Sequence, residues 1–138
     1  MTSDLAYLSI AEASRLIHAR KLSPVELTEA VLARAEKLQP VLNCFITLAR
    51  EQAMAAAQQA EDAIMQGRPL GLLHGIPFAA KDLVNSSGVR TTFGSLLHED
   101  NVPEEDAVAA ARLKQAGANL FGNTTTPEFG HKALTDAP

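Results

Sequence analysis

The sequence is poor in cysteine, in aromatic residues and in positive charge. Aromatic residues make up 4% of its 138 residues, and the formal net charge is −4 with no block of basic residues. Nucleic-acid-binding proteins usually carry a clustered basic surface, so the sequence argues against this class. The single cysteine, Cys44, excludes a disulfide within the chain. Its apolar neighbours indicate a small buried side chain, in keeping with a reducing compartment.

Long uncharged runs are also missing. The longest lies between Lys114 and Glu128 and is rich in glycine and threonine, whereas a membrane-spanning helix needs about 20 mostly apolar residues. The amino-terminal stretch MTSDLAYLSIAEASRL carries Asp4 and Glu12, where a secretory signal has a positive start and an apolar centre. We therefore expect a cytoplasmic protein that contacts no membrane.

Two common kinds of binding site are absent as well. His74, His98 and His131 are widely spaced and belong to no His-x-x-x-His or Cys/His cluster, which argues against a metal site. The glycines between residues 67 and 75 lack the Gly-Lys-Ser/Thr ending of a phosphate-binding loop. We expect neither a metal nor another cofactor.

The sequence does contain the composition and the pattern of one globular unit, with 46% hydrophobic and 20% charged residues. Capping-box spacings at Ser9–Glu12 and Ser23–Glu26 predict two helix starts, and the second helix is expected to stop before Pro40. The expected helices cover about residues 9–21, 24–38, 50–65 and 106–116. The expected strands cover about residues 44–48, 76–81 and 118–122. Strands that alternate with helices, without linkers or repeats, predict an α/β fold.

The most informative stretch is GLLHGIPFAAKDLVNSSG, residues 71–88. Its apolar residues 76–80 predict a short buried strand, with Pro77 near the strand's start or at a sheet edge because proline lacks the amide donor. Lys81 follows, and a lysine at the end of a buried strand is costly unless it is paired, hydrogen-bonded or neutral. Asp82 should face the other way and bond loop amides, since adjacent strand residues point to opposite faces. An ordinary Lys–Asp pair at a strand end remains the alternative.

Two motifs, in this order, resemble the amidase signature family of serine hydrolases. The first is the Gly-Ile-Pro-x-x-x-Lys-Asp segment from Gly75 to Asp82. The matching residues of the second are Asp106, Arg112, Leu113, Gly117, Gly122, Pro127, Glu128 and Phe129. The likeness covers the chain from about residue 8 to its end. It implies the amino-terminal part of a single amidase domain, in which a mixed sheet is layered between helices, and which is incomplete in residues 1–138.

The resemblance also implies a catalytic role for Lys81. In the family a neutral lysine takes a proton through a bridging serine, held in a cis peptide, and so activates a nucleophilic serine that forms an acyl-enzyme. Both serines lie in a Gly/Ser-rich segment downstream of the Pro-Glu-Phe element, and residues 1–138 hold no such segment. Ser86 and Ser87 follow Lys81 closely, and the Gly/Ser-rich pattern of a tight oxyanion turn is missing around them. Burial beside the apolar residues 76–80 is expected to favour the neutral form of Lys81.

A long loop, about residues 82–105, follows Lys81, and the resemblance places it near the active-site cleft. Long loops inside compact domains are often functional. Thr92, Gly94 and Ser95 are therefore candidates for the pocket wall, and Asp82 is a candidate for structural support. For each single hydroxyl group, a role in a turn or a helix cap is the alternative.

The implied function is hydrolysis of a small-molecule carboxylic amide by the complete domain. The partner of this chain would then be the missing remainder of that domain, and the resemblance leaves a homodimer open. We expect the chain alone to be inactive, because a general base without a nucleophile has nothing to activate. The alternatives are the amidase-type (A) component of a tRNA-dependent amidotransferase and a non-catalytic truncated fragment.

Two observations bear on the choice between these alternatives. Asn123 and Thr125 stand where the family usually has lysine and asparagine, which affects the substrate more than the reaction class. The segment from Gly130 to Asp136 is more similar to stand-alone bacterial amidases than to the amidotransferase components. The sequence therefore favours the stand-alone amidase.

Overall fold

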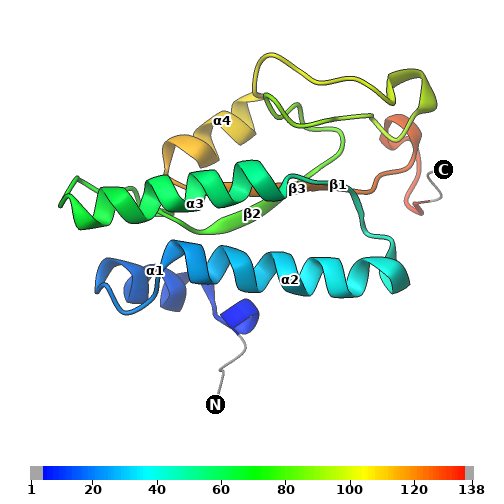
Figure 1. Cartoon of the computed structure of the whole chain (residues 1–138). Helices are drawn as coiled ribbons and strands as arrows, with labels where there is room; N and C mark the ends of the chain where they lie inside the picture. Colours follow the sequence, from blue (N-terminus) through cyan, green and yellow to red (C-terminus); the bar gives the residue numbers. More distant parts are fainter. Residues whose placement is uncertain (1–4, 136–138) are drawn as a thin grey trace.

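The computed structural model describes residues 5–135 and shows a small mixed sheet with helices packed around it (Figure 1). The helices are α1 (Ile10–His18), α2 (Pro24–Leu42), α3 (Arg50–Met65) and α4 (Val108–Gln115). The strands are β1 (Phe45–Leu48), β2 (Pro77–Lys81) and β3 (Asn119–Thr124). Three short 3-10 turns complete the described part: η1 (Leu5–Tyr7), η2 (Leu96–His98) and η3 (Glu128–Gly130). The predicted α/β class is confirmed.

Strand β3 is the centre of the sheet, whose order is β1-β3-β2. It runs antiparallel to β1 and parallel to β2, so that Lys81 at the end of β2 lies opposite Thr124 at the end of β3. A parallel pair needs a crossover, and here the crossover is the long loop together with α4. Pro77 starts β2, where its missing amide leaves the sheet ladder intact.

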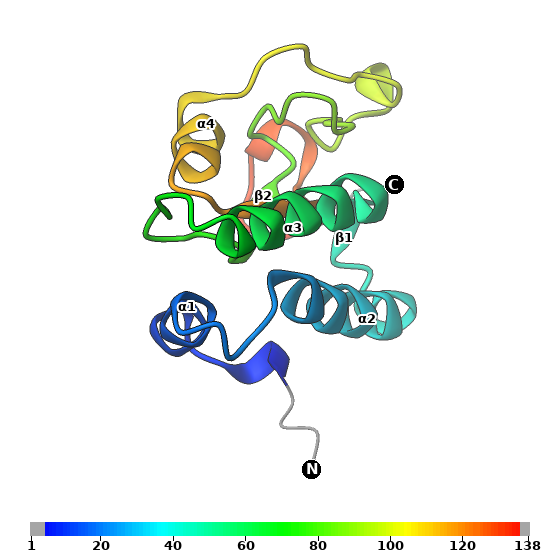
Figure 2. The same ribbon diagram turned by 60° about the vertical axis from the view of Figure 1, so that its left-hand side comes forward.

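The helices lie on two sides of this sheet. Helices α1 and α2 are on one side of α3 and the strands, whereas α4 and the long loop are on the other (Figures 1 and 2). The two views agree on this arrangement. Because β2 and β3 are parallel, their carboxyl ends lie at the same edge of the sheet. The segments that leave this edge are residues 82–105 and 125–135.

Apolar contacts and one buried amide fix α2 and α3 against β3. Leu32 has no exposed area and clusters with Ala53 and Phe121. Burying a leucine side chain of this kind stabilises a fold by about 1.5–3 kcal/mol. The Asn119 side-chain amide donates from Nδ2 to Thr28 Oγ1 at 3.1 Å and to the Ala53 carbonyl at 2.9 Å. These two bonds tie the start of β3 to both helices.

The expected end of the second helix was wrong. Ser23 and Glu26 form the predicted capping box, but α2 continues through Pro40 to Leu42. Its last turn is held from outside, because the Gln39 side chain accepts from the Phe45 amide at 3.0 Å and donates to the Phe45 carbonyl at 2.7 Å. These contacts outweigh the local preference of a residue before proline for extended backbone.

The last helix starts later than expected. It begins at Val108, so the acidic residues before it lie outside its first turn. Asp106 instead accepts from Lys114 Nζ at 2.7 Å and from the Ser87 amide at 2.7 Å. Burial of the Asp106 carboxyl opposes its ionisation, but the hydrogen bonds from Lys114 and Ser87 outweigh burial and lower its pKa. Asp106 therefore joins the long loop to α4.

Candidate functional site

Lys81 is the last residue of β2, and the fold places it at the edge of the described sheet. Its side chain is exposed, whereas the residues on either side, Ala80 and Asp82, are buried. Residues 5–135 therefore do not by themselves give Lys81 the burial that its proposed role needs. Strand β2 pairs only with β3 and is therefore an edge strand of the described sheet. No further strand in residues 5–135 lies beside it at the end that carries the lysine.

Asp82 is buried completely, and uncharged donors surround its carboxylate. The Thr92 amide donates to both carboxylate oxygens at 3.0 Å, and the Thr92 hydroxyl donates to Oδ2 at 2.6 Å. The Gly94 amide adds a longer bond of 3.3 Å to the same oxygen. Hydrogen bonds to a charged group contribute about 1.5–3 kcal/mol each. The carboxylate thus holds the loop at residues 92–94 against the end of β2.

Backbone hydrogen bonds reinforce the same junction. The Asp82 amide donates to the Thr124 carbonyl at 3.0 Å, and the Phe93 amide donates to the Asp82 carbonyl at 3.0 Å. The Val84 amide donates to the Lys81 carbonyl at 2.8 Å and closes a turn directly after the lysine. The backbone of Lys81 is therefore bound to β3, to this turn and, through its neighbour, to the loop.

Gly94 and Ser95 connect this loop to the segment that follows β3. Gly94 has a φ of +67°, and a Cβ atom at this position would lie 2.6 Å from the Thr126 carbonyl oxygen. A side chain has no room in such a contact, so the backbones of the two segments touch. The Ser95 hydroxyl donates to Glu128 Oε1 at 2.7 Å. The structure thus brings together the candidate residues Asp82, Thr92, Gly94 and Ser95, next to Lys81.

Sequence reasoning missed a pair of aromatic residues in the same place. Phe93 and Phe129 both have left-handed backbone, with φ of 57° and 49°, and the Phe129 amide donates to the Phe93 carbonyl at 2.8 Å. The His98 ring meets both phenyl rings edge-on, with centroids 5.2 Å and 6.0 Å away. Such backbone costs about 1–3 kcal/mol per residue and clusters at functional sites. The Pro-Glu-Phe motif was the only sequence signal for it.

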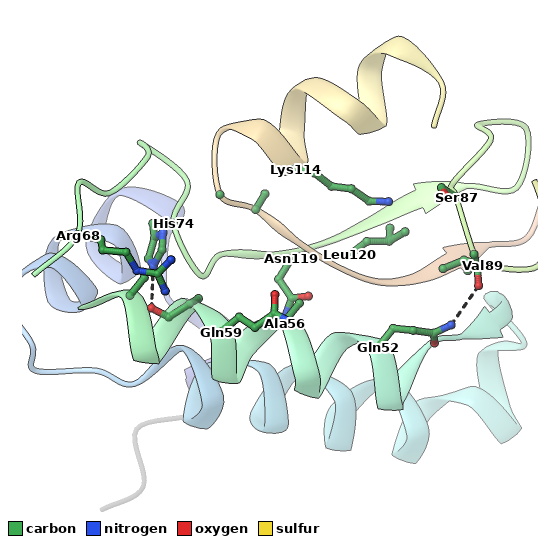
Figure 3. Close-up of a pocket in the computed structure, with 15 residues that line it drawn as sticks. Gln52, Ala56, Gln59, Arg68, His74, Ser87, Val89, Lys114, Asn119 and Leu120 are labelled. Atoms are coloured by element: carbon green, nitrogen blue, oxygen red, sulfur yellow. Dashed lines mark hydrogen bonds between the residues drawn. The ribbon is translucent and has the colours of Figure 1, made fainter. Parts of the chain in front are cut away.

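A separate cavity of about 650 Å³ lies between α3, α4 and the start of β3 (Figure 3). The Lys114 side chain extends from α4 toward Ser87 across it. Gln52 closes one end by donating to the Gly88 carbonyl at 3.0 Å. His74 lines the other end, with its Nε2 atom 2.8 Å from the Ala60 carbonyl oxygen. Lys81 is not among the residues that line this cavity.

Two further findings concern residues 5–135. No group of three or more histidine, cysteine, aspartate or glutamate side chains is close enough there to hold a metal ion. In the same part of the chain, no helix combines the length and the apolar character needed to cross a bilayer.

Comparison with known proteins identifies the family. The family model described as Amidase matches residues 26–138, which includes Lys81, Asp82 and the whole loop that follows them. The chain belongs to the amidase family. The fold and the order of its motifs are therefore those of the amino-terminal part of an amidase domain, as the sequence predicted.

Relatives of this amidase-family chain include both kinds of protein that the sequence suggested. The A component of a glutamyl-tRNA(Gln) amidotransferase from Dehalococcoides mccartyi is 43% identical over 136 residues, which is 97% of this chain and 27% of that protein. An acylamidase from Rhodococcus erythropolis is 37% identical over 133 residues, 96% of this chain and 28% of that protein. The chain thus spans about a quarter of the length of the curated relatives it matches.

A solved structure agrees in backbone geometry. The crystal structure of a bacterial aryl acylamidase of the amidase signature family superposes with a TM-score of 0.90 at 29% sequence identity. The match covers 97% of this chain and 28% of that one. The three-stranded sheet and its helices are therefore one portion of a larger fold in that enzyme.

Proposed function

We propose that this chain is the amino-terminal part of an amidase that hydrolyses a carboxylic amide through a serine acyl-enzyme, and that Lys81 is its general base. One observation carries the proposal. The Gly-Ile-Pro-x-x-x-Lys-Asp motif lies on β2 so that its lysine ends the strand, in a fold shared with an aryl acylamidase. The proposed location of the protein is the cytoplasm.

The proposed role requires a lysine that loses its charge near neutral pH, which burial in an apolar site favours. Lys81 is exposed among residues 5–135. We infer that other parts of the protein cover the edge of β2 and supply this burial, together with the nucleophilic serine and the bridging serine. Residues 1–138 contain no Gly/Ser-rich segment of the kind that carries these serines in the family. The chain alone should therefore be inactive.

The amidotransferase component is the second candidate. The 43% identity to the A component of a glutamyl-tRNA(Gln) amidotransferase favours it, whereas the segment from Gly130 to Asp136 favours a stand-alone amidase. An amidotransferase component would need its partner proteins and glutamyl-tRNA(Gln) for its main reaction. A stand-alone amidase would act on a simple amide without them.

The experiment compares residues 1–138 with the complete protein encoded by the same reading frame, using hydrolysis of a simple aryl amide. We expect a Gly-Gly-Ser-Ser-Gly-Gly-like segment after Pro138, turnover by the complete protein, and none by residues 1–138. Turnover that appears only with partner proteins and charged tRNA would support the amidotransferase instead. A stop codon directly after Pro138, or turnover by residues 1–138 that Lys81→Ala abolishes, would contradict the proposal.

A further inference from the structure

We propose that Thr92 and Asp82 act as one positioning unit for Lys81. This inference rests on the proposed function, because it assumes that Lys81 is the general base. The way in which the two residues hold the lysine is argued from the contacts of the described residues. Neither residue is offered as a catalytic residue, because the unit would act through the lysine's backbone.

The first step is the connection between the lysine and the carboxylate. Asp82 follows Lys81 directly, and its amide is bound to the Thr124 carbonyl at the end of β3. The carboxylate then turns into the protein and is fully buried. The Asp82 backbone lies inside the turn that the Val84 amide closes by donating to the Lys81 carbonyl, so the bonds that hold the carboxylate also restrain this turn.

The second step is the pair of hydrogen bonds that the Thr92 hydroxyl makes. It donates to Asp82 Oδ2 at 2.6 Å and accepts from the Gly94 amide at 3.2 Å, so it fills the corner between the carboxylate and the loop. A charged acceptor makes the first of these bonds stronger than one between neutral groups. Thr92 itself is 4% exposed, so water has little access to replace its hydroxyl.

The third step is the anchor on the far side of the loop. Phe93 lies between Thr92 and Gly94, and its carbonyl accepts from the Phe129 amide. Ser95 adds its bond to Glu128. The loop is therefore fixed to the segment after β3, and the Thr92–Asp82 contact transmits that fixed position to the strand end that carries Lys81.

Thr91 provides a matched control. It is the neighbouring residue, has no exposed area, and also uses its hydroxyl twice. The hydroxyl donates to the Val89 carbonyl at 3.0 Å and accepts from Nδ2 of the Asn123 side chain at 3.1 Å. Neither of these hydroxyl bonds involves Asp82. Thr91→Val and Thr92→Val therefore make the same chemical change at a similar depth, but only the second removes a side-chain hydrogen bond to the carboxylate.

The first readout uses the chain itself, labelled with ¹³C at the lysine ε carbons, with the Lys81 signal assigned from Lys81→Arg. We expect Thr92→Val to shift or split the Lys81 Hε–Cε signal, Thr92→Ser to keep it as in the wild type, and Thr91→Val to leave it unchanged. If Thr92→Val does not fold, Thr92→Ala removes the same hydroxyl with less volume. Equal responses to the Thr91 and Thr92 changes, or no response to either, would overturn the proposal.

The second readout is steady-state kinetics in the complete enzyme. A displaced catalytic group can cost about 100-fold in rate, so kcat should fall by about that factor in Thr92→Val, with KM nearly unchanged and with rescue by Thr92→Ser. Lys81→Ala separates the two hypotheses. Retained activity in Lys81→Ala refutes the proposed function, whereas lost activity there with full kcat in Thr92→Val refutes only the positioning role.

Discussion

Replacement of Gly94 by alanine tests whether the loop after β2 and the segment after β3 are in backbone contact. Gly94 and Gly88 both have left-handed backbone, with φ of +67° and +73°. A Cβ atom at Gly88 would meet nothing within 4 Å, whereas at Gly94 it would lie 2.6 Å from the Thr126 oxygen and 3.1 Å from the Pro127 carbonyl carbon. Both substitutions therefore place an alanine in left-handed backbone, but only Gly94→Ala also causes a steric clash with the backbone of another segment.

The expected magnitudes follow from these contacts. Left-handed backbone costs an alanine about 1–2 kcal/mol, so Gly88→Ala should destabilise the chain by that amount. Gly94→Ala should add about 1–3 kcal/mol of overpacking, because the obstacle is backbone and cannot rotate away. With a urea slope of about 1–3 kcal/mol per molar, the unfolding midpoint of Gly94→Ala should lie about 1 M below that of Gly88→Ala.

Urea unfolding followed by far-ultraviolet circular dichroism measures both midpoints under the same conditions. Coincident midpoints for Gly94→Ala and Gly88→Ala would show that the two segments are not in contact. That result would also remove the anchor on which the positioning of Lys81 by Thr92 and Asp82 depends.

Two further predictions concern the stability of the fold. Leu32→Ala should cost about 2–5 kcal/mol, because its fully buried side chain leaves a cavity between α2, α3 and β3. Leu72→Ala, at a side chain that is 86% exposed, should change stability by less than about 0.5 kcal/mol in the same urea titration. The pKa of Asp106 is lowered in the folded chain. Its ionised carboxylate therefore stabilises the fold at pH values above the pKa of the unfolded chain, about 3.9, and this stabilisation is lost as the pH falls through the lower pKa of the folded chain. The stability difference between wild type and Asp106→Asn should therefore shrink as the pH falls below about 4, and a difference that grows on acidification would contradict the contacts with Lys114 and Ser87.

Local sequence patterns were enough to predict the strand that carries Lys81. Residues 76–80 are a short apolar run between turn signals, and Pro77 could only stand at a strand start or an edge. The same kind of reasoning failed at Pro40, because the hydrogen bonds between Gln39 and Phe45 that extend α2 come from the chain beyond the helix. Tertiary contacts of this kind leave no local signal.

The surroundings of Lys81 were harder to predict for a related reason. Burial of a strand end depends on which elements cover it, and the described chain places β2 at a sheet edge. The left-handed backbone of Phe93 and Phe129 also escaped prediction, since bulky residues rarely adopt it and no propensity indicates it. The loop residues Thr92, Gly94 and Ser95 could be named from the family resemblance, and Asp82 was expected to bond loop amides. Which amides it binds, and that Ser95 pairs with Glu128, became visible only in the structure.

The central claim is that Lys81 is a general base, and amide hydrolysis by Lys81 variants of the complete protein tests it most directly. Lys81→Ala should lose several orders of magnitude in turnover, because the base and the nucleophile act as a unit. Lys81→Arg should fail nearly as completely, since a guanidinium does not deprotonate in a protein. Lys81→Ala should melt close to the wild type, because removal of a lysine that is buried in the complete protein also removes the cost of burying it. If Lys81→Arg kept about a tenth of the wild-type rate, the loss would be far smaller than the loss expected when such a unit is broken. That result would contradict the assignment.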